Sequence, residues 1–332
     1  MHELSFSIAK PPQPDNEEKE YDLIILGGGP AGLTAAIYAS RAQMKTLLVE
    51  KNYIGGETVS TGMIENYPGF PDGINGFELA DRMLKQAERF GAHIYYGAPE
   101  DMDLKSHPKK IGINGTTLSA KTVIIASGAS PKHLNIPGEK KFRGRGVSYC
   151  ATCDGPIFRG KDIAIVGAGS SGLQEGLFIL KFVKSLTVIE YLPTVQAEKV
   201  IEQRMRAHNN VNWLLNHHIL SINGDTSVTS VSVQDRSNGE IKDIPMDGIF
   251  IYIGLDPNTD YLNNQVDLDE RGYIRTNSKM QTLISGVFAA GDIRDTEMRQ
   301  VATAIGDGAV AASSAQHFVD NLSTVKIRSV PC

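Results

Sequence analysis

The sequence contains few cysteines and no long apolar run. Three cysteines among 332 residues are too few for the disulfide framework of a small secreted protein. No stretch approaches the roughly 20 apolar residues that a membrane-spanning helix needs, and the N-terminal segment lacks the apolar core of a signal peptide. We therefore expect a cytoplasmic protein with no membrane segment.

Clustered positive charge is also absent. The formal net charge is −5 and no basic cluster is present, so we expect no nucleic-acid partner. The length and the 41% content of hydrophobic residues allow about two domains of roughly 100–200 residues each. Residues 1–20 are rich in proline and acidic residues, a composition that predicts a flexible N-terminal arm.

An internal repeat organises the rest of the chain. Residues 22–50 align without a gap with residues 162–190, and each copy reads as strand, glycine-rich turn, helix, and strand ending in glutamate. The glycines of the two G-x-G-x-x-G motifs are Gly27, Gly29 and Gly32, then Gly167, Gly169 and Gly172. In this motif the glycines permit a tight turn, a close approach to a pyrophosphate, and helix–strand packing.

The terminal acids of the two copies, Glu50 and Glu190, each follow the first glycine by 23 residues. A carboxylate at this place usually binds a ribose hydroxyl group. Two copies in register predict two dinucleotide-binding domains. The alternative is that the glycine-rich turns serve only the fold of an α/β domain and bind no nucleotide.

The segments between the copies predict how these domains are connected. Apolar strands at 121–130 and 247–259 lead into glycine and proline, and we interpret them as hinges around an inserted domain. The expected fold class is α/β, with two Rossmann-like dinucleotide-binding domains of the three-layer ββα type, the second inserted in the first. The expected boundaries are 21–129 plus 255–332 for the first domain and 130–254 for the inserted domain. A strand within 282–293 and a helix from Val301 to Phe318 complete the first domain.

Several motifs together resemble the low-molecular-weight thioredoxin reductases. They occur in the order found in that family: GGGPAGLTAAIYASRA, GGE at 55–57, ENYPG at 65–69, GRGVSYCATCDG at 144–155, FAAGDI at 288–293, and RQVATAIGDGAVAA at 299–312. The resemblance covers nearly the whole chain from residue 21. It implies a homodimeric FAD enzyme whose second domain swivels about the hinges, with thioredoxin or a thioredoxin-like protein as partner.

The resemblance also implies which residues bind FAD. The first-repeat glycines would face its pyrophosphate, Glu50 its adenosine ribose, and Asp292 the ribityl end. The full expected set is Gly27, Gly29, Pro30, Ala31, Gly32, Glu50, Lys51, Gly56, Glu57, Asn66, Gly128, Asp292, Arg299, Gln300 and Val301. The family commonly has glutamine where this chain has Glu57, so the role of Glu57 is open.

Cys150 and Cys153 are spaced C-x-x-C, as suits dithiol exchange. Two thiols at this spacing can close a small disulfide ring, and a following helix start would stabilise a thiolate. The resemblance assigns Cys153 to the flavin side, Cys150 to attack on the substrate disulfide, and Asp154 to protonation of the leaving thiolate. An inert buried pair stays open as an alternative.

Other interpretations of the cysteines have less support. A zinc site would need a second cysteine or histidine pair at suitable spacing, and none is present, so we expect no metal. A static disulfide does not suit a cytosolic chain. Cys332, the last residue, is interpreted as an unconstrained thiol of the tail.

Residues flanking the dithiol are candidates for partner docking. By resemblance, Arg145 and Phe158 would contact thioredoxin through charge and an apolar surface. For Phe158 the alternative is packing beneath its own loop, and the role of Tyr149 is undecided.

The strand end at Glu190 departs from the NADPH-using members of the family, which carry His-Arg-Arg there and a further arginine. This chain has no arginine between Ser185 and Gln203. A single unit charge facing a carboxylate at about 4 Å costs roughly 4 kcal/mol at an effective dielectric of 20, and a 2′-phosphate carries about −1.5 to −2 charges. NADPH is therefore a poor fit.

Three occupants remain for the second nucleotide site. They are NADH, a second FAD or other adenine nucleotide, and none, with electrons then coming from ferredoxin or a reduced flavin. The phrase I-E-Y-x-P is similar to a deep-branching set of thioredoxin reductases that do not use NADPH. We expect a disulfide oxidoreductase that passes electrons from a donor other than NADPH to FAD, the dithiol and thioredoxin. The alternatives are an NADH-dependent thioredoxin reductase, a dithiol oxidase that reduces oxygen, and a non-enzymatic redox sensor.

Overall fold

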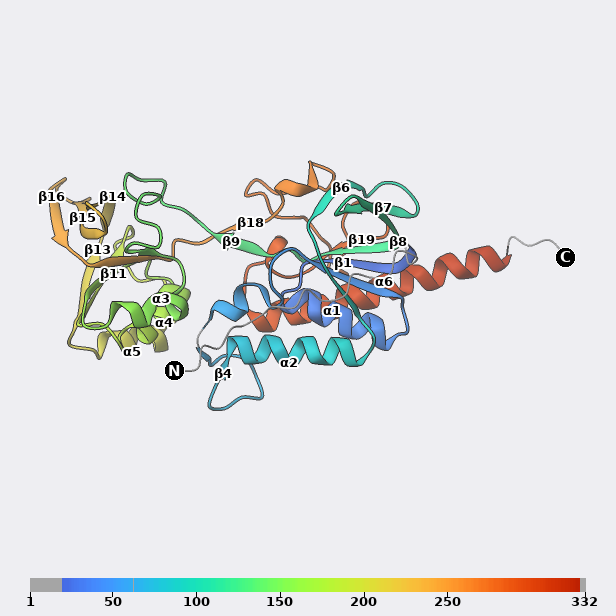
Figure 1. Cartoon of the computed structure of the whole chain (residues 1–332), viewed down its shortest axis with the longest axis horizontal. Helices are drawn as coiled ribbons and strands as arrows, with labels where there is room; N and C mark the ends of the chain where they lie inside the picture. The colour runs from blue at the N-terminus through green and yellow to red at the C-terminus, as the bar shows by residue number, and fades with distance from the viewer. Residues whose placement is uncertain (1–19, 62, 329–332) are drawn as a thin grey trace, which may run out of the picture.

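The computed structural model describes residues 20–61 and 63–328, with side chains for all of these except 60, 152, 153 and 323–328. The predicted N-terminal arm, apart from Glu20, and the predicted tail thiol Cys332 lie outside the described residues. The chain forms two lobes that two strands connect (Figure 1).

The larger lobe is built on a sheet with the strand order β5-β2-β1-β8-β7-β6, with β19 beside β8. The strands β1, β2, β5, β8 and β19 run parallel, and β6 and β7 add antiparallel pairs. The bounds are β1 Glu20–Leu26, β2 Thr46–Glu50, β5 His93–Tyr96, β6 Pro99–Asp103, β7 Lys109–Ile113, β8 Thr116–Ile125 and β19 Val287–Ala289. The central strands are buried on both faces, which explains their nearly continuous runs of apolar residues.

Three helices cover one face of this sheet: α1 Pro30–Arg41, α2 Gly76–Arg89 and α6 Val301–Arg328. On α1 and α6 most of the packing residues are alanines, which let the two helices approach closely. Strands β6 and β7 and the segment from Leu262 to Ile293 enclose a second core on the opposite face. Helix α6 extends beyond the predicted end at Phe318, because Val319 still packs on the core and no glycine or proline follows before Arg328.

The smaller lobe has three layers. Its central parallel sheet has the order β10-β17-β11-β12-β13, and a three-stranded antiparallel sheet, β14-β15-β16, packs on one face. Helices α3, α4 and α5 pack on the other face. The strands are β10 Val147–Ser148, β11 Asp162–Val166, β12 Ser185–Glu190, β13 Val211–Leu215, β14 His217–Gly224, β15 Val228–Asp235, β16 Ile241–Pro245 and β17 Gly248–Ile251; the helices are α3 Ala151–Asp154, α4 Ser170–Ile179 and α5 Lys199–Arg206.

The connection between the lobes is a two-stranded antiparallel ribbon, visible at the centre of Figure 1. Strand β9 (Ala129–Pro131) pairs with β18 (Leu255–Pro257), and the N–H of Lys132 extends the pairing to the carbonyl of Gly254 at 2.9 Å. The predicted boundaries at 129/130 and 254/255 fall at this ribbon and stay predictions. The remaining short elements are η1 Gly56–Ser60, β3 Met63–Ile64, β4 Ile74–Asn75, η2 Gly155–Phe158, η3 Asp260–Leu262 and η4 Gly291–Ile293.

Side-chain contacts also join the two lobes. Arg204 of α5 forms an ion pair with Glu65 at 2.6 Å, and Nε2 of Gln174 on α4 donates to the carbonyl of Met63 at 3.3 Å. Both charged groups of the ion pair are more than half exposed, so this pair contributes little to global stability. Among the described helices, none has the length and apolar character that crossing a membrane demands.

Candidate active site

The three glycines of the first repeat are required for different reasons. Gly27 has a φ of 116°, and a Cβ there would lie 2.3 Å from the carbonyl oxygen of Ala126. A Cβ on Gly32 would lie 1.9 Å from the carbonyl oxygen of Gly27, so this glycine permits the packing of α1 on β1. A Cβ on Gly29 would meet nothing within 4 Å. Gly29 therefore borders open space, as expected if a ligand approaches the backbone there.

The second repeat reproduces this pattern. Gly167 has a φ of 102°, and its Cβ would lie 2.1 Å from the carbonyl oxygen of Tyr252. A Cβ on Gly172 would lie 2.4 Å from the Gly167 oxygen, whereas one on Gly169 would meet nothing within 4 Å. The second repeat thus keeps the same space at the start of α4.

The terminal glutamates of the two repeats also make matching hydrogen bonds. Glu50 accepts the N–H of Gly28 and that of Asn52, both at 2.8 Å. Glu190 accepts the N–H of Ala168 at 2.6 Å and that of Leu192 at 2.9 Å, and only 9% of the residue is exposed. Each carboxylate therefore joins the glycine-rich turn of its own repeat to the loop that follows the strand.

One cavity of about 400 Å³ collects the predicted cofactor residues, a size typical of ligand sites. Of the predicted FAD-binding residues, all but Gly32 line it; these are Gly27, Gly29, Pro30, Ala31, Glu50, Lys51, Gly56, Glu57, Asn66, Gly128, Asp292, Arg299, Gln300 and Val301. The smaller lobe contributes Cys150, Glu175 and Tyr252 to the same cavity. The structure thus brings the first glycine-rich turn and the first cysteine of the C-x-x-C motif to one site.

Two charged residues that line this cavity, Arg299 and Asp292, are partly buried. The Nε and Nη2 atoms of Arg299 are buried and have no hydrogen-bond partner among the described residues, and its guanidinium lies 4.0 Å from the centre of the Tyr273 ring. Burial raises the pKa of Asp292 to about 6, although the nearby Arg299 acts in the opposite direction. Unsatisfied buried donors are costly, so these atoms fit a bound polar ligand.

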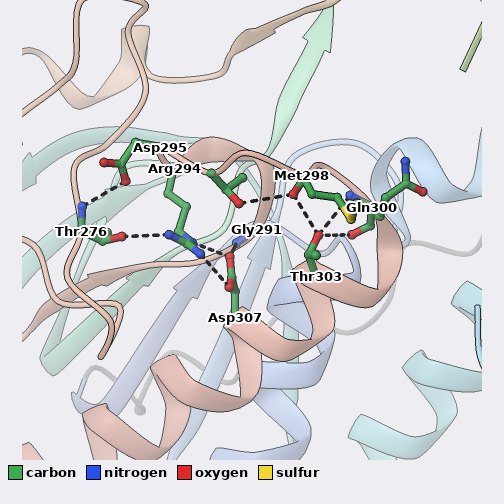
Figure 2. A network of polar contacts seen from close by, with 9 residues as sticks. Thr276, Gly291, Arg294, Asp295, Met298, Gln300, Thr303 and Asp307 are labelled. Atoms are coloured by element: carbon green, nitrogen blue, oxygen red, sulfur yellow. Dashed lines mark hydrogen bonds and ion pairs between the residues drawn. The ribbon is translucent and has the colours of Figure 1, made fainter. Parts of the chain in front are cut away.

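The loop that carries Asp292, Arg299 and Gln300 is fixed by an ion pair that sequence reasoning missed. Figure 2 shows Arg294 facing Asp307 on α6; Nε and Nη2 of the arginine donate to the two carboxylate oxygens at 2.5 and 3.0 Å. The same carboxylate accepts the N–H of Gly291 at 3.1 Å. Asp307 lies inside the motif at 299–312, but Arg294 follows the motif at 288–293 by one residue, so the motifs alone do not indicate this pair.

The dithiol lies at the start of the one-turn helix α3. Cys150 is disulfide-bonded, and the side chain of Cys153 is outside the described set. The predicted helix start is confirmed by the structure, but the helix has only four residues, too short for a large macrodipole. Asp154 lies close enough to Tyr252 to raise the pKa of the phenol, after the larger effects of burial and Glu175.

Glu175 on α4 is a further ionisable group of the cavity, which sequence reasoning did not identify. Its Oε2 atom is buried without a hydrogen-bond partner among the described residues. Burial raises the pKa of this carboxyl to about 7. Near neutral pH the group therefore exists in both protonation states, a property that often marks functional carboxyl groups.

The strand end after Glu190 is not free of positive charge. Arg236, from the turn after β15, lies with its guanidinium 3.7 Å from the centre of the Tyr191 ring, and its Nη1 donates to the carbonyl of Tyr191 at 2.8 Å. His218 contacts the same ring edge-on at 5.6 Å. Arg236 follows Tyr191 by 45 positions, so the residues next to the strand give no indication of it.

The two predicted docking residues differ in exposure. Arg145 is exposed, and its Nη2 donates to the carbonyl of Lys141 at 2.6 Å. Phe158 is half-buried and packs against Phe250 with a centroid distance of 5.5 Å. Its neighbour Ile157 is 74% exposed and is the apolar side chain that this loop presents to solvent.

Comparison with known proteins identifies relatives along the whole described fold. The pyridine nucleotide-disulphide oxidoreductase family model matches residues 21–308. The thioredoxin reductase of Bacillus subtilis is 41% identical over 308 residues, which are 92% of this chain and 97% of that protein. The structure of Lactococcus lactis thioredoxin reductase in its FR conformation superposes with a TM-score of 0.88 at 40% identity, covering 91% of this chain and 99% of that one.

A more distant solved structure is a ferredoxin-flavin thioredoxin reductase from Clostridium acetobutylicum, with a TM-score of 0.51 and 28% identity over 92% of this chain and 99% of that one. The two Rossmann-like domains, the cavity and these similarities all indicate the same family. The chain belongs to the low-molecular-weight thioredoxin reductases of the pyridine nucleotide-disulphide oxidoreductase family, and is a flavoprotein disulfide reductase.

Proposed function

We propose that this protein reduces the disulfide of thioredoxin or a thioredoxin-like protein through Cys150 and Cys153, with electrons from a donor other than NADPH. The observation that carries the proposal is the shared cavity, in which Cys150 of the smaller lobe and the first-repeat residues of the larger lobe form one lining. A redox-active cysteine and a dinucleotide site must be brought close together for electrons to pass between them.

The residues of the first repeat fit FAD, which the family binds. The open space at Gly29 and the N-terminus of α1 suit a pyrophosphate, and Glu50 suits the adenosine ribose. Asp292 and the unpartnered nitrogens of Arg299 suit the ribityl and ring end. When bound, FAD supplies the means to accept two electrons from a donor and pass them to a disulfide.

The chain's own residues perform the disulfide exchange. In the reduced protein, the thiolate of Cys150 attacks a sulfur of the partner's disulfide; a bond between the two proteins forms, and the partner's own S–S bond breaks. Asp154 donates a proton to the leaving thiolate. The thiolate of Cys153 then attacks the sulfur of Cys150: the internal disulfide forms, the bond to the partner breaks, and the partner's second thiolate takes up a proton from solvent.

The strand end at Glu190 supports a donor other than NADPH. The carboxylate is held by two backbone N–H groups at a buried place, where a 2′-phosphate would face a negative charge. Arg236 offsets part of that repulsion, but one of its nitrogens is already engaged by the carbonyl of Tyr191. A ribose with two free hydroxyl groups, as in NADH, meets the same carboxylate geometry that Glu50 presents in the first repeat.

Ferredoxin or another protein donor is the second candidate for the electron source. It is supported by the similarity to the ferredoxin-flavin thioredoxin reductase described above. In that case the second glycine-rich turn would serve the fold, or would bind a nucleotide that does not donate electrons. The two candidates differ in whether NADH alone reduces the protein.

An anaerobic stopped-flow experiment tests the proposal. FAD-loaded protein is mixed separately with NADH, NADPH and reduced ferredoxin, and the loss of visible flavin absorbance is followed, with thioredoxin then added to reoxidise the protein. We expect bleaching by NADH or ferredoxin and reoxidation by thioredoxin. Fast bleaching by NADPH would contradict the donor assignment, and rapid peroxide formation with a small dithiol, without thioredoxin reduction, would contradict the reductase assignment.

Variants test the assignment of the cysteines. In Cys150→Ser, thioredoxin reduction should be lost while Cys153 remains near the flavin, which predicts a new long-wavelength absorbance band. In Cys153→Ser the band should be absent. The reverse pattern would exchange the two roles.

We place thioredoxin against Arg145 and the exposed Ile157 rather than against the half-buried Phe158. We also propose that the protein is a homodimer. Ile157→Ser should raise the KM for thioredoxin with little change in the reduction of a small disulfide. Equal KM values for the variant and the parent protein would contradict this docking site.

A further inference from the structure

The two residues on either side of Cys150 are each held by a hydrogen bond of a tyrosine hydroxyl group. Tyr149 lies immediately before it, and its Oη donates to Oε1 of Glu139 at 2.5 Å. Ala151 lies immediately after it, and its N–H donates to Oη of Tyr252 at 3.0 Å. We call Tyr149 and Tyr252 the tyrosine clamp. Tyr252 holds the peptide group after the cysteine directly, through the N–H of Ala151, and Tyr149 holds the residue before it through the anchored side chain.

The Glu139 side of the clamp is a buried charged group. Glu139 is 3% exposed, and it also accepts the backbone N–H of Leu134 at 2.9 Å and that of Asn135 at 2.6 Å. Burial alone would raise its pKa, but the hydrogen bonds from Tyr149, Leu134 and Asn135 outweigh this effect and lower the pKa. The carboxylate is therefore ionised at neutral pH, and its bond to Tyr149 is of the strong, charge-assisted kind.

Tyr149 stays a hydrogen-bond donor across the physiological pH range. Burial, and then its bond to Glu139, raise the pKa of the phenol, with Arg143 acting in the opposite direction. Nδ1 of His133 lies 2.8 Å from the same Oη. Since the phenol proton is given to Glu139, Nδ1 must carry a hydrogen and donate to Tyr149, an assignment that follows from the bonding pattern.

The Tyr252 side of the clamp is neutral and rigid. Burial is the largest cause that raises the pKa of this phenol, followed by the negative charge of Glu175. The backbone N–H of Tyr252 donates to the carbonyl of Val166 at 2.8 Å, which fixes the tyrosine to strand β11. Ala151, the residue that it holds, is buried in the core of the smaller lobe.

Each side of the clamp is adjacent to one strand of the ribbon that joins the lobes. His133 follows the end of β9 by two residues, and Tyr252 precedes the start of β18 by three. A third bond, from the N–H of Cys150 to Oγ of Ser148 at 3.1 Å, closes the same turn. Both crossing segments thus end in a contact beside the cysteine that lines the cavity.

We propose that Tyr149 and Tyr252 are positioning residues of the dithiol, which hold the Cys150 backbone in place while its sulfur changes bonding partner. The inference rests on the proposed function for its use in thioredoxin reduction. In the exchange, the bond between Cys150 and the partner breaks as the thiolate of Cys153 attacks, and the partner leaves as a thiolate that takes up a proton. A fixed Cys150 raises the effective concentration of the two enzyme sulfurs for each other.

The test measures that effective concentration without NADH, NADPH or ferredoxin. Tyr149→Phe, Tyr252→Phe and the double variant are prepared in a Cys332→Ser background and equilibrated anaerobically with defined mixtures of reduced and oxidised glutathione. The dithiol fraction is then trapped by alkylation and counted by mass spectrometry. Tyr95→Phe is the matched control, because Tyr95 is a buried tyrosine of the other lobe whose hydroxyl also accepts an N–H, from Asn114 at 3.2 Å.

We expect Tyr149→Phe to lower the equilibrium constant for closing the internal disulfide by about tenfold, because a hydrogen bond to a charged group is lost. Tyr252→Phe should lower it by a few-fold, and Tyr95→Phe should leave it within twofold of the parent. Glu139→Gln, which keeps the shape but removes the charge, should show a smaller loss than Tyr149→Phe. Both clamp variants lying within twofold of the parent would overturn the proposal.

A second readout separates this inference from the proposed function. The same proteins, reduced with stoichiometric dithionite, are mixed with Ellman's disulfide and with oxidised thioredoxin. If the parent protein reduces Ellman's disulfide but not thioredoxin, and the glutathione equilibrium shifts as expected, the proposed function fails and the clamp stands. If the parent reduces thioredoxin and the equilibrium does not move, the function stands and the clamp fails.

Discussion

Replacing Glu175 by glutamine should make the stability of the protein less sensitive to pH. Burial raises the pKa of Glu175 from near 4.5 to about 7. Because the raised value belongs to the folded state, an acid group of this kind lowers stability as pH rises from the unfolded to the folded pKa. A difference of about 2.5 pKa units corresponds to about 3 kcal/mol, reached above pH 7 and absent below pH 4.5.

The glutamine variant does not ionise, so it avoids this cost. Relative to the parent, Glu175→Gln should gain about 1 kcal/mol at pH 5, about 2 kcal/mol at pH 6 and about 3 kcal/mol at pH 8. Urea unfolding at each pH, with the same saturating FAD throughout, measures the difference. The control is Glu88→Gln on the exposed face of α2. A stability difference that is flat between pH 5 and pH 8 would refute the assignment of a buried, easily protonated carboxyl group.

Three further predictions concern the glycine turn, the loop at α6 and the second strand end. Gly29→Ala should fold normally, since its Cβ meets no protein atom, yet lose FAD because the Cβ fills the space beside the backbone where the ligand approaches. Gly32→Ala should fail to fold, because its Cβ would lie 1.9 Å from a carbonyl oxygen. Circular dichroism measures folding and visible absorbance measures bound FAD; two variants that both retain FAD would contradict these expectations. Asp307→Asn should lower the free energy of unfolding by about 3–5 kcal/mol, because it leaves the partly buried Arg294 without its charged partner. A loss under about 1 kcal/mol in urea unfolding, the range of a surface pair, would show that this ion pair does not hold the loop. Arg236→Ala should weaken 2′,5′-ADP binding more than ADP binding, as isothermal titration would measure, and equal losses would mean that Arg236 acts only on the loop.

Local sequence determines the parts of the site that could be predicted. The glycines and glutamates of the two repeats were found because each motif is made by consecutive elements, in which steric limits and strand ends fix the residue type. The dithiol and its helix start are local for the same reason. The structure confirms the two Rossmann-like domains and brings Cys150 to the cavity of the first repeat.

The contacts that the sequence could not predict join distant parts of the chain. Ala151 meets Tyr252 across 101 positions, and Asn66 donates to Gln300 across 234. Such pairs depend on how sheets and loops pack in three dimensions, and neither residue type is unusual where it stands. The sequence also left open whether Phe158 contacts the partner or packs beneath its own loop, because the answer depends on residues such as Phe250 that are distant in the sequence.

The ribbon of β9 and β18 has a mechanical consequence. Two paired strands resist being pulled apart, since that would break the hydrogen bonds between them. They accept changes of twist more easily, because the twist between paired strands covers a wide range and is larger in two-stranded ribbons. The softest relative motion of the two lobes is therefore a rotation about the ribbon axis at nearly constant separation. A pulling force applied between the lobes would strain the hydrogen bonds of the ribbon, whereas a torque would strain the side-chain contacts between the lobes, such as the exposed pair Arg204–Glu65.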